Sequence, residues 1–423
     1  MRLALPSFQF RFMAAMGNVI FPANFHPVGS QRAGEELVER ALATRQWETP
    51  GAGGRWLVVG GSGGFGSAAR AVLGATLGAH TLNVSLDAQP QPDSRNKIRK
   101  IGSPGFHRNL AIERSLRGLG LAAQTINADA FAPETIAAAI EAAKEALGGP
   151  LDGIIWSLAA PRATDPRSGK AVVSALRPVG APVSVKTFGA PEGDGEPPVM
   201  EFAIDPGSPE EAVHTQFVMG GAIVDTWIRA LLEADALAEG CRLLTISYRG
   251  NPLNEGIYRK GLIGLAKADL EFHTKALDAL LKRERGGQAL VVEGPAVVTE
   301  ASGGIPGVPF YMALLLDVMG DRFEDPLASM LRMFAEKIPA GGEPDVDAEG
   351  LVRMDDRELA DDLQAELTAR FDAYAVGDGF DPKLYARFLD EYAQTRGFAI
   401  AGVDYDAEFD TDAICDVAPP RAE

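Results

Sequence analysis

Two sets of residues, far apart in the sequence, have types and spacings that suit redox chemistry. A glycine-rich turn at residues 60–66 follows the apolar run 56–59, and Lys267 follows Tyr258 by nine positions. A glycine turn between a strand and a helix lets the backbone approach the pyrophosphate of a dinucleotide. A lysine ammonium beside a tyrosine stabilises the phenolate, so the tyrosine donates its proton more readily. Together the two features predict a reductase that binds a dinucleotide.

The glycine turn fits two spacings that are typical of dinucleotide-binding folds. They are G-x-G-x-x-G at Gly61, Gly63 and Gly66, and the short-chain reductase spacing G-x-x-x-G-x-G at Gly60, Gly64 and Gly66. A helix that begins at the turn offers free N–H groups and the positive end of its dipole to phosphate. Asp87 stands twenty-one positions after Gly66, where a carboxylate binds the adenosine ribose. The alternative is a structural turn with Asp87 in solvent, which the strand before the turn and the helix after it disfavour.

Asp87 also bears on which nicotinamide cofactor is used. A carboxylate at this position repels the 2′-phosphate of NADPH, so we expect NADH. A basic stretch follows soon after, and its side chains could instead hold that phosphate. The simpler interpretation is a solvated basic loop. Its residues are Arg95, Lys97, Arg99 and Lys100.

The tyrosine and the lysine can meet only under a structural condition. Nine positions on an ideal helix make about two and a half turns, which would place the two side chains far apart. They converge if the segment near Gly261 is irregular, or if Tyr258 lies before the helix. An exposed tyrosine with an unrelated lysine is the alternative, which the cofactor turn makes less attractive. Tyr248, ten positions before Tyr258, either points into the same site or is a boundary aromatic.

Strands and helices alternate along the chain, as they do in a parallel sheet covered on both faces. The predicted strands are 56–59, 81–86, 151–156, 242–247, 289–292 and 296–299. The predicted helices are 32–43, 67–77, 134–147, 210–238 and 306–319, and the tyrosine–lysine segment continues as a helix through Leu281. The apolar helix 306–319 is a candidate wall of an acyl pocket. Residues 161–209 are Pro- and Gly-rich and predict a lid-like insertion, and the tail after Asp321 is acidic and amphipathic.

The expected fold class is therefore α/β, a Rossmann-type doubly wound parallel sheet like that of short-chain dehydrogenases, with N-terminal, lid-like and C-terminal extensions. We expect a single enlarged domain over residues 1–423. Its cofactor-binding and catalytic core would cover residues 50–300, and an apolar helix with an acidic extension would cover residues 301–423.

The bulk composition excludes several classes of function. A formal net charge of −18 argues against binding to nucleic acid or to an anionic membrane. The two cysteines, Cys241 and Cys415, make no disulfide framework and suit a reducing cytoplasm. The five histidines show no metal-ligand spacing, so we predict no metal. Residues 1–12 lack the long apolar core of a signal peptide, and we expect no membrane span.

At these residues the chain resembles the FabV-type trans-2-enoyl-ACP/trans-2-enoyl-CoA reductases, a large relative of the short-chain dehydrogenases. The gap of eight residues between Tyr258 and Lys267 is specific, because ordinary short-chain reductases use shorter gaps. The resemblance runs nearly the full length of the chain. The similar segments are 24–29, 60–70, 129–131, 156–162, 218–221, 248–267, 297–299, 355–359 and 403–406.

The resemblance implies reduction of the 2,3-trans double bond of an enoyl thioester by NADH, in a monomeric, cytoplasmic enzyme of lipid metabolism and fatty acid biosynthesis. It implies that Tyr258 is the proton donor, that Lys267 binds NAD, and that Tyr248 contacts the thioester. The residues that would line the cofactor are Gly60, Gly61, Ser62, Gly63, Gly64, Phe65, Gly66, Leu86, Asp87, Asp129, Ala130, Leu158, Ala159, Lys267, Val297, Val298 and Thr299. Taken alone, Asp129-Ala130 predicts only a loop at a strand end, and residues 297–299 only a buried strand.

The chain departs from the family pattern at several positions. Asn254-Glu255-Gly256 replaces a Thr-Trp-Pro-like sequence before the second tyrosine, and Leu86-Asp87 replaces Phe-Glu. Ser30 stands where cysteine is common, and the loop 90–105 is longer than usual. These changes leave three alternatives: a carbonyl reductase of the short-chain class, a divergent member acting in specialised metabolism, and a dinucleotide-binding protein without catalysis. The acyl chain length, the choice of CoA or carrier protein, and the pathway stay open: primary fatty acid synthesis, specialised metabolite assembly and short-chain fermentation-type reduction.

Overall fold

A seven-stranded parallel sheet forms the centre of the computed structural model, which describes residues 2–193, 195–339 and 342–415. The strand order is β14-β13-β12-β7-β4-β5-β6, and each neighbouring pair is parallel. The strands are β4 (Arg55–Val59), β5 (His80–Ser85), β6 (Ala123–Asn127), β7 (Leu151–Trp156), β12 (Leu237–Ser247), β13 (Gln288–Glu293) and β14 (Leu351–Arg353). This order confirms the expected Rossmann-type fold.

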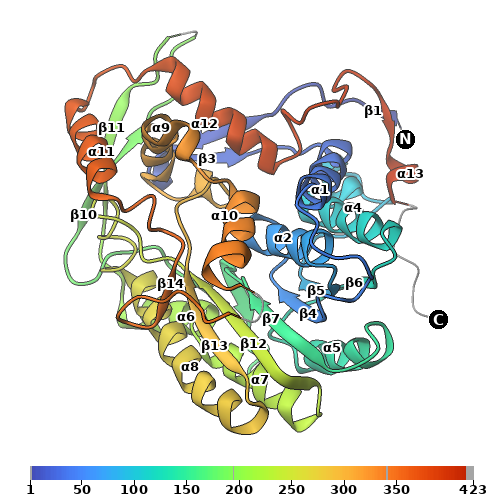
Figure 1. The fold of residues 1–423 in the computed structure, drawn as a ribbon. Coiled ribbons are helices and arrows are strands. Elements are labelled where there is room, and N and C mark those ends of the chain that lie inside the picture. The colour runs from blue at the N-terminus through green and yellow to red at the C-terminus, as the bar shows by residue number, and fades with distance from the viewer. Residues whose placement is uncertain (1, 194, 340–341, 416–423) are drawn as a thin grey trace.

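Helices cover both faces of the sheet, which explains why the central strands are continuous apolar runs. One face packs against α1 (Pro27–Leu42), α2 (Gly64–Ala71), α4 (Pro104–Gly118) and α10 (Pro326–Arg332). The other face packs against α5 (Pro133–Glu145), α7 (Ala222–Glu233) and α8 (Leu262–Arg285). Figure 1 shows the sheet between these two layers.

A third core lies beside the sheet and is built from segments distant in sequence. Its helices are α9 (Val308–Met319), α11 (Asp361–Ala373) and α12 (Pro382–Thr395), and its hairpins are β2 (Phe10–Met13) with β3 (Val19–Pro22) and β10 (Val183–Phe188) with β11 (Val199–Ile204). The apolar helix α9 is buried on nearly every side, as its composition requires. Tyr258 and Val298 belong to the same core, so this third layer packs directly against the predicted site.

The remaining elements lie outside the central sheet and the helices described so far. They are β1 (Arg2–Leu3), β8 (Arg162–Thr164), β9 (Ala171–Val173), β15 (Phe409–Asp410), α3 (Lys97–Ile101), α6 (Pro209–Met219), α13 (Thr411–Cys415), and the short helical segments η1 (Ala14–Met16), η2 (Val72–Thr76), η3 (Ser302–Gly304), η4 (Gly320–Arg322) and η5 (Met333–Lys337). None of the described helices is long and apolar enough to cross a membrane. The Cys415 side chain and the end of the acidic tail, 416–423, lie outside the described residues.

Some of the predicted elements are wrong. Residues 296–299 form a loop rather than a strand, because the Ala296 N–H donates to the Glu358 side chain and the Thr299 N–H donates to the Ser302 hydroxyl. The predicted helix 210–238 is two helices, and its last residues start β12. The break falls at Gly221, whose N–H donates to Asp269 on α8 at 2.8 Å.

Other segments have more regular structure than the sequence pattern predicts. Strand β6 and strand β14 were not predicted, although both belong to the sheet. The lid-like region contains two hairpins, and part of the basic loop is helix α3, begun by the Asn96 side chain as N-cap. The helix after the glycine turn begins at Gly64 rather than Ser67.

Candidate functional site

The glycine turn connects β4 to α2, as predicted. Gly60 has φ of 95° and Gly64 has φ of 51°, in the left-handed region that favours glycine. A Cβ on Gly66 would overlap the Gly60 carbonyl, and a Cβ on Gly61 would overlap the Asn83 side chain. These glycines therefore let the strand, turn and helix pack closely, and the first turn of α2 keeps its N–H groups directed at the space beyond β4.

Arg108 on α4 supports the turn and was not identified from the sequence. Its guanidinium donates to the Ser62 carbonyl and, at 2.8 Å, to the Thr395 carbonyl, and it lies 3.3 Å from the Glu300 carboxylate. The side chain is almost fully buried. A fixed cation behind this turn adds to the positive potential that a pyrophosphate would meet. Nothing in the local pattern around Arg108 points to this contact, because its partners come from three distant segments.

Asp87 lies beside the glycine turn, two residues beyond the end of β5. Its carboxylate accepts hydrogen bonds from Ser62 (2.8 Å), Ser85 (3.0 Å), Ser103 (3.2 Å) and Asn109 (3.2 Å). Only the Ser103 bond uses Oδ1, so that oxygen keeps acceptor capacity for a ribose hydroxyl. The neighbouring Leu86 is 69% exposed, which leaves an apolar surface next to Asp87 for a flat ring such as adenine.

Two more predicted cofactor segments follow the strands next to β4 and β5. Asp129 and Ala130 come after β6, where the Asp129 carboxylate accepts the Phe131 N–H at 3.0 Å. Leu158 and Ala159 come after β7, and the Leu158 backbone lies against Gly60. Because parallel strands end at the same edge of the sheet, these residues border the space above the glycine turn.

The loop after β13 completes this edge. Val297 and Val298 are buried, and the Thr299 methyl group lies in contact distance of a Cβ built on Gly64. The loop is held by Ser302, whose hydroxyl accepts the Thr299 N–H at 2.8 Å. The structure therefore brings residues 297–299 next to the glycine turn, although they do not form the predicted strand.

Tyr258 precedes α8, which satisfies the condition set by its spacing from Lys267. Helix α8 starts at Leu262, and Tyr258 sits in the turn before it. A Cβ on Gly264 would overlap the Tyr258 and Arg259 carbonyls, so glycine lets this turn fold back on the first turn of α8. Tyr258 is 9% exposed and Lys267 is 8% exposed. The Lys267 ammonium lies 3.4 Å from the Ile246 carbonyl at the end of β12.

Tyr248 lies directly against Tyr258. The ring centroids are 4.8 Å apart and the planes are nearly perpendicular, at 88°. The Asn254 side-chain amide donates to the Tyr248 hydroxyl at 3.1 Å, so this hydroxyl can still donate its own proton to another acceptor. Glu255, one of the residues at which the chain departs from the family pattern, forms an ion pair with Lys260 on the surface.

Burial fixes the protonation of these groups. It raises the pKa of Tyr258 and of Tyr248, and the nearby Glu358 charge raises both further. Burial lowers the pKa of Lys267, and the charges of Glu293 and Glu271 oppose that effect. Both tyrosines therefore hold their protons at neutral pH and act as hydrogen-bond donors.

Glu358 is a second residue whose role was not identified from the sequence. Its carboxylate accepts hydrogen bonds from the Tyr311 hydroxyl (2.6 Å), the Asn251 amide (3.0 Å) and the Ala296 N–H (2.6 Å). Burial raises the pKa of Glu358, and these three donors oppose the rise. The carboxylate thus joins α9, the tyrosine loop and the loop after β13.

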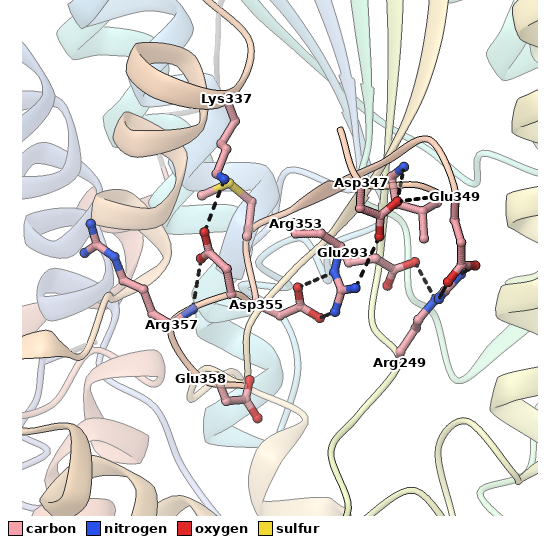
Figure 2. Close-up of polar contacts among 12 residues, drawn as sticks. Arg249, Glu293, Lys337, Asp347, Glu349, Arg353, Asp355, Arg357 and Glu358 are labelled. Atoms are coloured by element: carbon pink, nitrogen blue, oxygen red, sulfur yellow. Dashed lines mark hydrogen bonds and ion pairs between the residues drawn. The ribbon is translucent and has the colours of Figure 1, made fainter. Parts of the chain in front are cut away.

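Ion pairs tether the C-terminal region to the sheet beside the site, as Figure 2 shows. Arg249, next to Tyr248, lies 3.3 Å from Glu293 and 3.0 Å from Glu349. Arg353 on β14 pairs with Asp355 at 2.7 Å and with Asp347 at 3.3 Å. The Arg249 contacts hold the loop before β14 against the ends of β12 and β13, and the Arg353 contacts fix the two loops that flank β14. Among the described residues, no group of three or more His, Cys, Asp or Glu side chains is placed to hold a metal.

Three family models match the chain. The model described as the trans-2-enoyl-CoA reductase catalytic region matches residues 100–338, more than half of the chain. The model described as the NAD(P)H binding domain of trans-2-enoyl-CoA reductase matches residues 14–92. The model described as an enoyl reductase FAD binding domain matches residues 346–409.

Curated relatives match most of the chain. An enoyl-[acyl-carrier-protein] reductase [NADH] from Opitutus terrae is 36% identical over 84% of this chain and 87% of its own length. A trans-2-enoyl-CoA reductase from Euglena gracilis is 34% identical over 92% of this chain and 69% of its own length. Among solved structures, the Treponema denticola trans-2-enoyl-CoA reductase in complex with NAD is 31% identical, with a TM-score of 0.82 over 96% of this chain and 98% of that one.

The residues of the segment 346–409 do not fit a flavin dinucleotide. Helix α11 has Asp361 and Asp362 in its first turn and α12 has Asp381 as N-cap, and these carboxylates repel a diphosphate. The sequence after β14, residues 354–360, contains no glycine. The described arginines of this segment that lie near the sheet and α9 are held in ion pairs, and its buried aromatic rings fill the third core. We therefore derive no step through a flavin.

Proposed function

This chain belongs to the trans-2-enoyl-CoA reductase family and is an NADH-dependent oxidoreductase, and from this premise we propose how its residues reduce the 2,3-trans double bond of an enoyl thioester. The observation that carries the proposal is the pair of buried tyrosines, Tyr248 and Tyr258, whose rings pack edge to face, together with the buried Lys267 on the helix that begins just after Tyr258. Bound NADH supplies the hydride that C3 of the substrate accepts. Electron density then moves to the thioester oxygen, and C2 takes up a proton.

Tyr258 has the role of proton donor in this proposal. The residue is buried and its hydroxyl is protonated, and in the described part of the chain that hydroxyl makes no hydrogen bond to protein. That hydroxyl is therefore free to stabilise the oxygen on which negative charge develops. In such catalysis, a donor already in place for the developing oxyanion usually lowers the barrier more than any other single group.

Tyr248 and Lys267 complete the catalytic group. Tyr248 contacts the thioester with the hydroxyl proton that Asn254 leaves available. Lys267 binds the nicotinamide ribose, and as a buried cation it lowers the cost of transferring the Tyr258 proton. The nearby charges of Glu293 and Glu271 favour its protonated form. The acyl chain lies toward α9, whose residues share a core with Tyr258.

The cofactor residues have distinct parts in this proposal. The turn from Gly60 to Gly66 and the start of α2 bind the pyrophosphate, with Arg108 behind them. Asp87 binds the adenosine ribose and Leu86 contacts the adenine. The nicotinamide half is lined by Leu158, Ala159, Val297, Val298 and Thr299, and the adenine side by Asp129 and Ala130.

The proposal extends to the setting in which the enzyme works. We treat residues 1–423 as one enlarged reductase domain that acts as a cytoplasmic monomer on CoA or carrier-protein thioesters in fatty acid biosynthesis. Support for a single unit comes from the third core, which combines residues from both ends of the chain with Tyr258. The buried, reduced Cys241 suits the cytoplasm.

NADH oxidation with crotonyl-CoA, with a longer enoyl-CoA and with an enoyl carrier protein tests the proposed function. We expect turnover with at least one thioester and a preference for NADH over NADPH. Turnover of ketones without turnover of any enoyl thioester would select the carbonyl reductase alternative. NADH binding without turnover of either class would select a protein without catalysis.

A further inference from the structure

Each of the two site tyrosines is followed by an arginine, and both arginines bind the same carboxylate. Arg249 Nη2 donates to Glu271 Oε2 at 2.8 Å, and Arg259 Nη1 donates to Glu271 Oε1 at 2.8 Å. Glu271 is only 6% exposed. Its two oxygens therefore hold the chain beside Tyr248 and the chain beside Tyr258 at one fixed separation.

The carboxylate sits on the same helix as the lysine. Glu271 follows Lys267 by four residues on α8, which places both on one face of the helix, one turn apart. The face is the buried one, because Leu270, Glu271 and Lys267 are all buried. One rigid helix thus carries the lysine and the anchor for both tyrosine segments.

We propose that Glu271 is a positioning residue, which sets both tyrosines relative to Lys267 through Arg249 and Arg259. The inference rests on the proposed function, because it concerns the geometry of the same site. Glu271 touches neither substrate nor cofactor in this proposal. It affects turnover by keeping the two tyrosine hydroxyl groups in position to donate to the oxygen on which negative charge develops.

The two arginines that bind Glu271 differ in their other contacts. Arg249 keeps two other carboxylate partners, Glu293 at 3.3 Å and Glu349 at 3.0 Å. Arg259 has no carboxylate partner besides Glu271 in the described ranges of the chain. Loss of Glu271 therefore releases the Tyr258 segment more than the Tyr248 segment, so proton donation suffers more than substrate contact.

The first test is Glu271→Gln, because the amide keeps the size of the side chain but turns one acceptor into a donor facing an arginine. A misplacement of about 1 Å lowers rates by up to about 100-fold, so we expect kcat to fall by about tenfold to 100-fold. The Kd for NADH, measured by fluorescence titration, should change by less than about threefold. Glu271 does not border the glycine turn, and Glu293, whose charge favours the protonated form of Lys267 more than that of Glu271 does, is kept in this variant. Unchanged kcat, or a loss confined to NADH affinity, would overturn the proposal.

Glu349→Gln is the matched control. Glu349 binds the same Arg249 through both oxygens, but it does not touch Arg259 and its side chain is 57% exposed. We expect kcat close to that of the wild type. An equal loss of kcat in Glu349→Gln and Glu271→Gln would show that the effect comes from the charge around Arg249. It would overturn the proposal that Glu271 positions both tyrosines through Arg249 and Arg259.

Arg259→Gln extends the test and covers the case in which Glu271→Gln does not fold. Arg259 is partly exposed, so its replacement leaves no buried charge except that of Glu271, which Arg249 still holds. We expect a fall in kcat comparable to that of Glu271→Gln, and a double variant no slower than the slower single variant. Additive losses would show independent actions and contradict the proposal.

The same assay on the wild type and on Tyr258→Phe distinguishes a failure of the proposed function from a failure of the positioning role of Glu271. No wild-type turnover of any thioester would refute the proposed function itself. Wild-type turnover that is lost in Tyr258→Phe but kept in Glu271→Gln and Arg259→Gln would refute only the positioning role.

Discussion

Replacement of Tyr258 by phenylalanine removes one hydroxyl from the site and leaves the ring in place. The ring packs edge-to-face against Tyr248 at 4.8 Å, and phenylalanine preserves that contact. The Tyr258 hydroxyl makes no hydrogen bond to the described protein, so its loss leaves no buried partner unsatisfied. The structure therefore predicts a variant that folds like the wild type and loses only the donor to the oxyanion.

The expected loss of turnover follows from the value of that donor. Removal of one oxyanion donor costs about 3–4 kcal/mol of transition-state stabilisation, which is about two to three orders of magnitude in kcat. The assay is NADH oxidation at saturating enoyl-CoA, with the melting temperature and the Kd for NADH measured on the same preparation. We expect both of these to stay close to the wild-type values.

Tyr385→Phe is the control for the loss of a buried hydroxyl. Tyr385 belongs to the same third core, and its hydroxyl is buried without a hydrogen-bond partner among the described residues. Its ring packs on Phe188 at 5.1 Å, away from the glycine turn. We expect Tyr385→Phe to keep full activity. A Tyr258→Phe variant that retains more than about a fifth of wild-type kcat would refute the assignment of the oxyanion donor, because it would correspond to a loss below about 1 kcal/mol.

Three further predictions follow. Lys267→Met should weaken NADH binding and lower kcat together, and an unchanged Kd for NADH in a fluorescence titration would contradict the role of Lys267 in binding the ribose. Burial raises the pKa of Glu293 from 4.5 to about 7, so the folded state retains a proton that the unfolded state has lost between these values, and stability falls as pH rises through this window. The difference in melting temperature between Glu293→Gln and the wild type should therefore shift in favour of the variant as pH rises from about 4.5 to 7, and it should stay constant above pH 7. A difference that does not change with pH between 4.5 and 7 would contradict this. Added FAD should leave NADH-dependent turnover unchanged and remain unbound after gel filtration, whereas a retained flavin with higher turnover would show that the segment 346–409 does bind it.

The parts of the site that depend on local sequence could be predicted. The glycine turn needs a strand, a tight turn and a helix in direct succession, and residues 56–71 supply all three. The spacing of Tyr258 and Lys267 set two conditions under which they converge, and the structure satisfies the one in which Tyr258 lies before the helix, with Gly261 as N-cap. Asp87 was expected at the end of the second strand; the structure has it two residues beyond the end of β5, where it accepts a hydrogen bond from Ser62 of the turn.

The parts that depend on distant segments could not be predicted. Arg108 contacts the turn and Thr395, and no pattern within α4 distinguishes it from a surface arginine. Glu358 lies in a charged stretch that resembles a solvated tail, yet it is buried against Tyr311 and Asn251. Strand β14 has three residues and few neighbours in sequence that mark it as part of the sheet.

The wrong predictions have the same origin. Residues 296–299 are apolar enough for a strand, but their backbone N–H groups bind the side chains of Glu358 and Ser302 instead of another strand. The helix breaks at Gly221 because of two residues on α8. Asp269 accepts the Gly221 N–H, and His273 lies where a Cβ on Gly221 would be. In both places, tertiary contacts override the local pattern.

The most direct test of the central claim follows the hydride. Reduction of an enoyl-CoA with NADH that carries deuterium at the transferred position should place one deuterium at C3 of the saturated acyl thioester, and the new hydrogen at C2 should come from solvent. Mass spectrometry and NMR of the product locate both atoms. Deuterium at a carbinol carbon of a ketone-derived product, with no label entering an acyl thioester, would contradict the account.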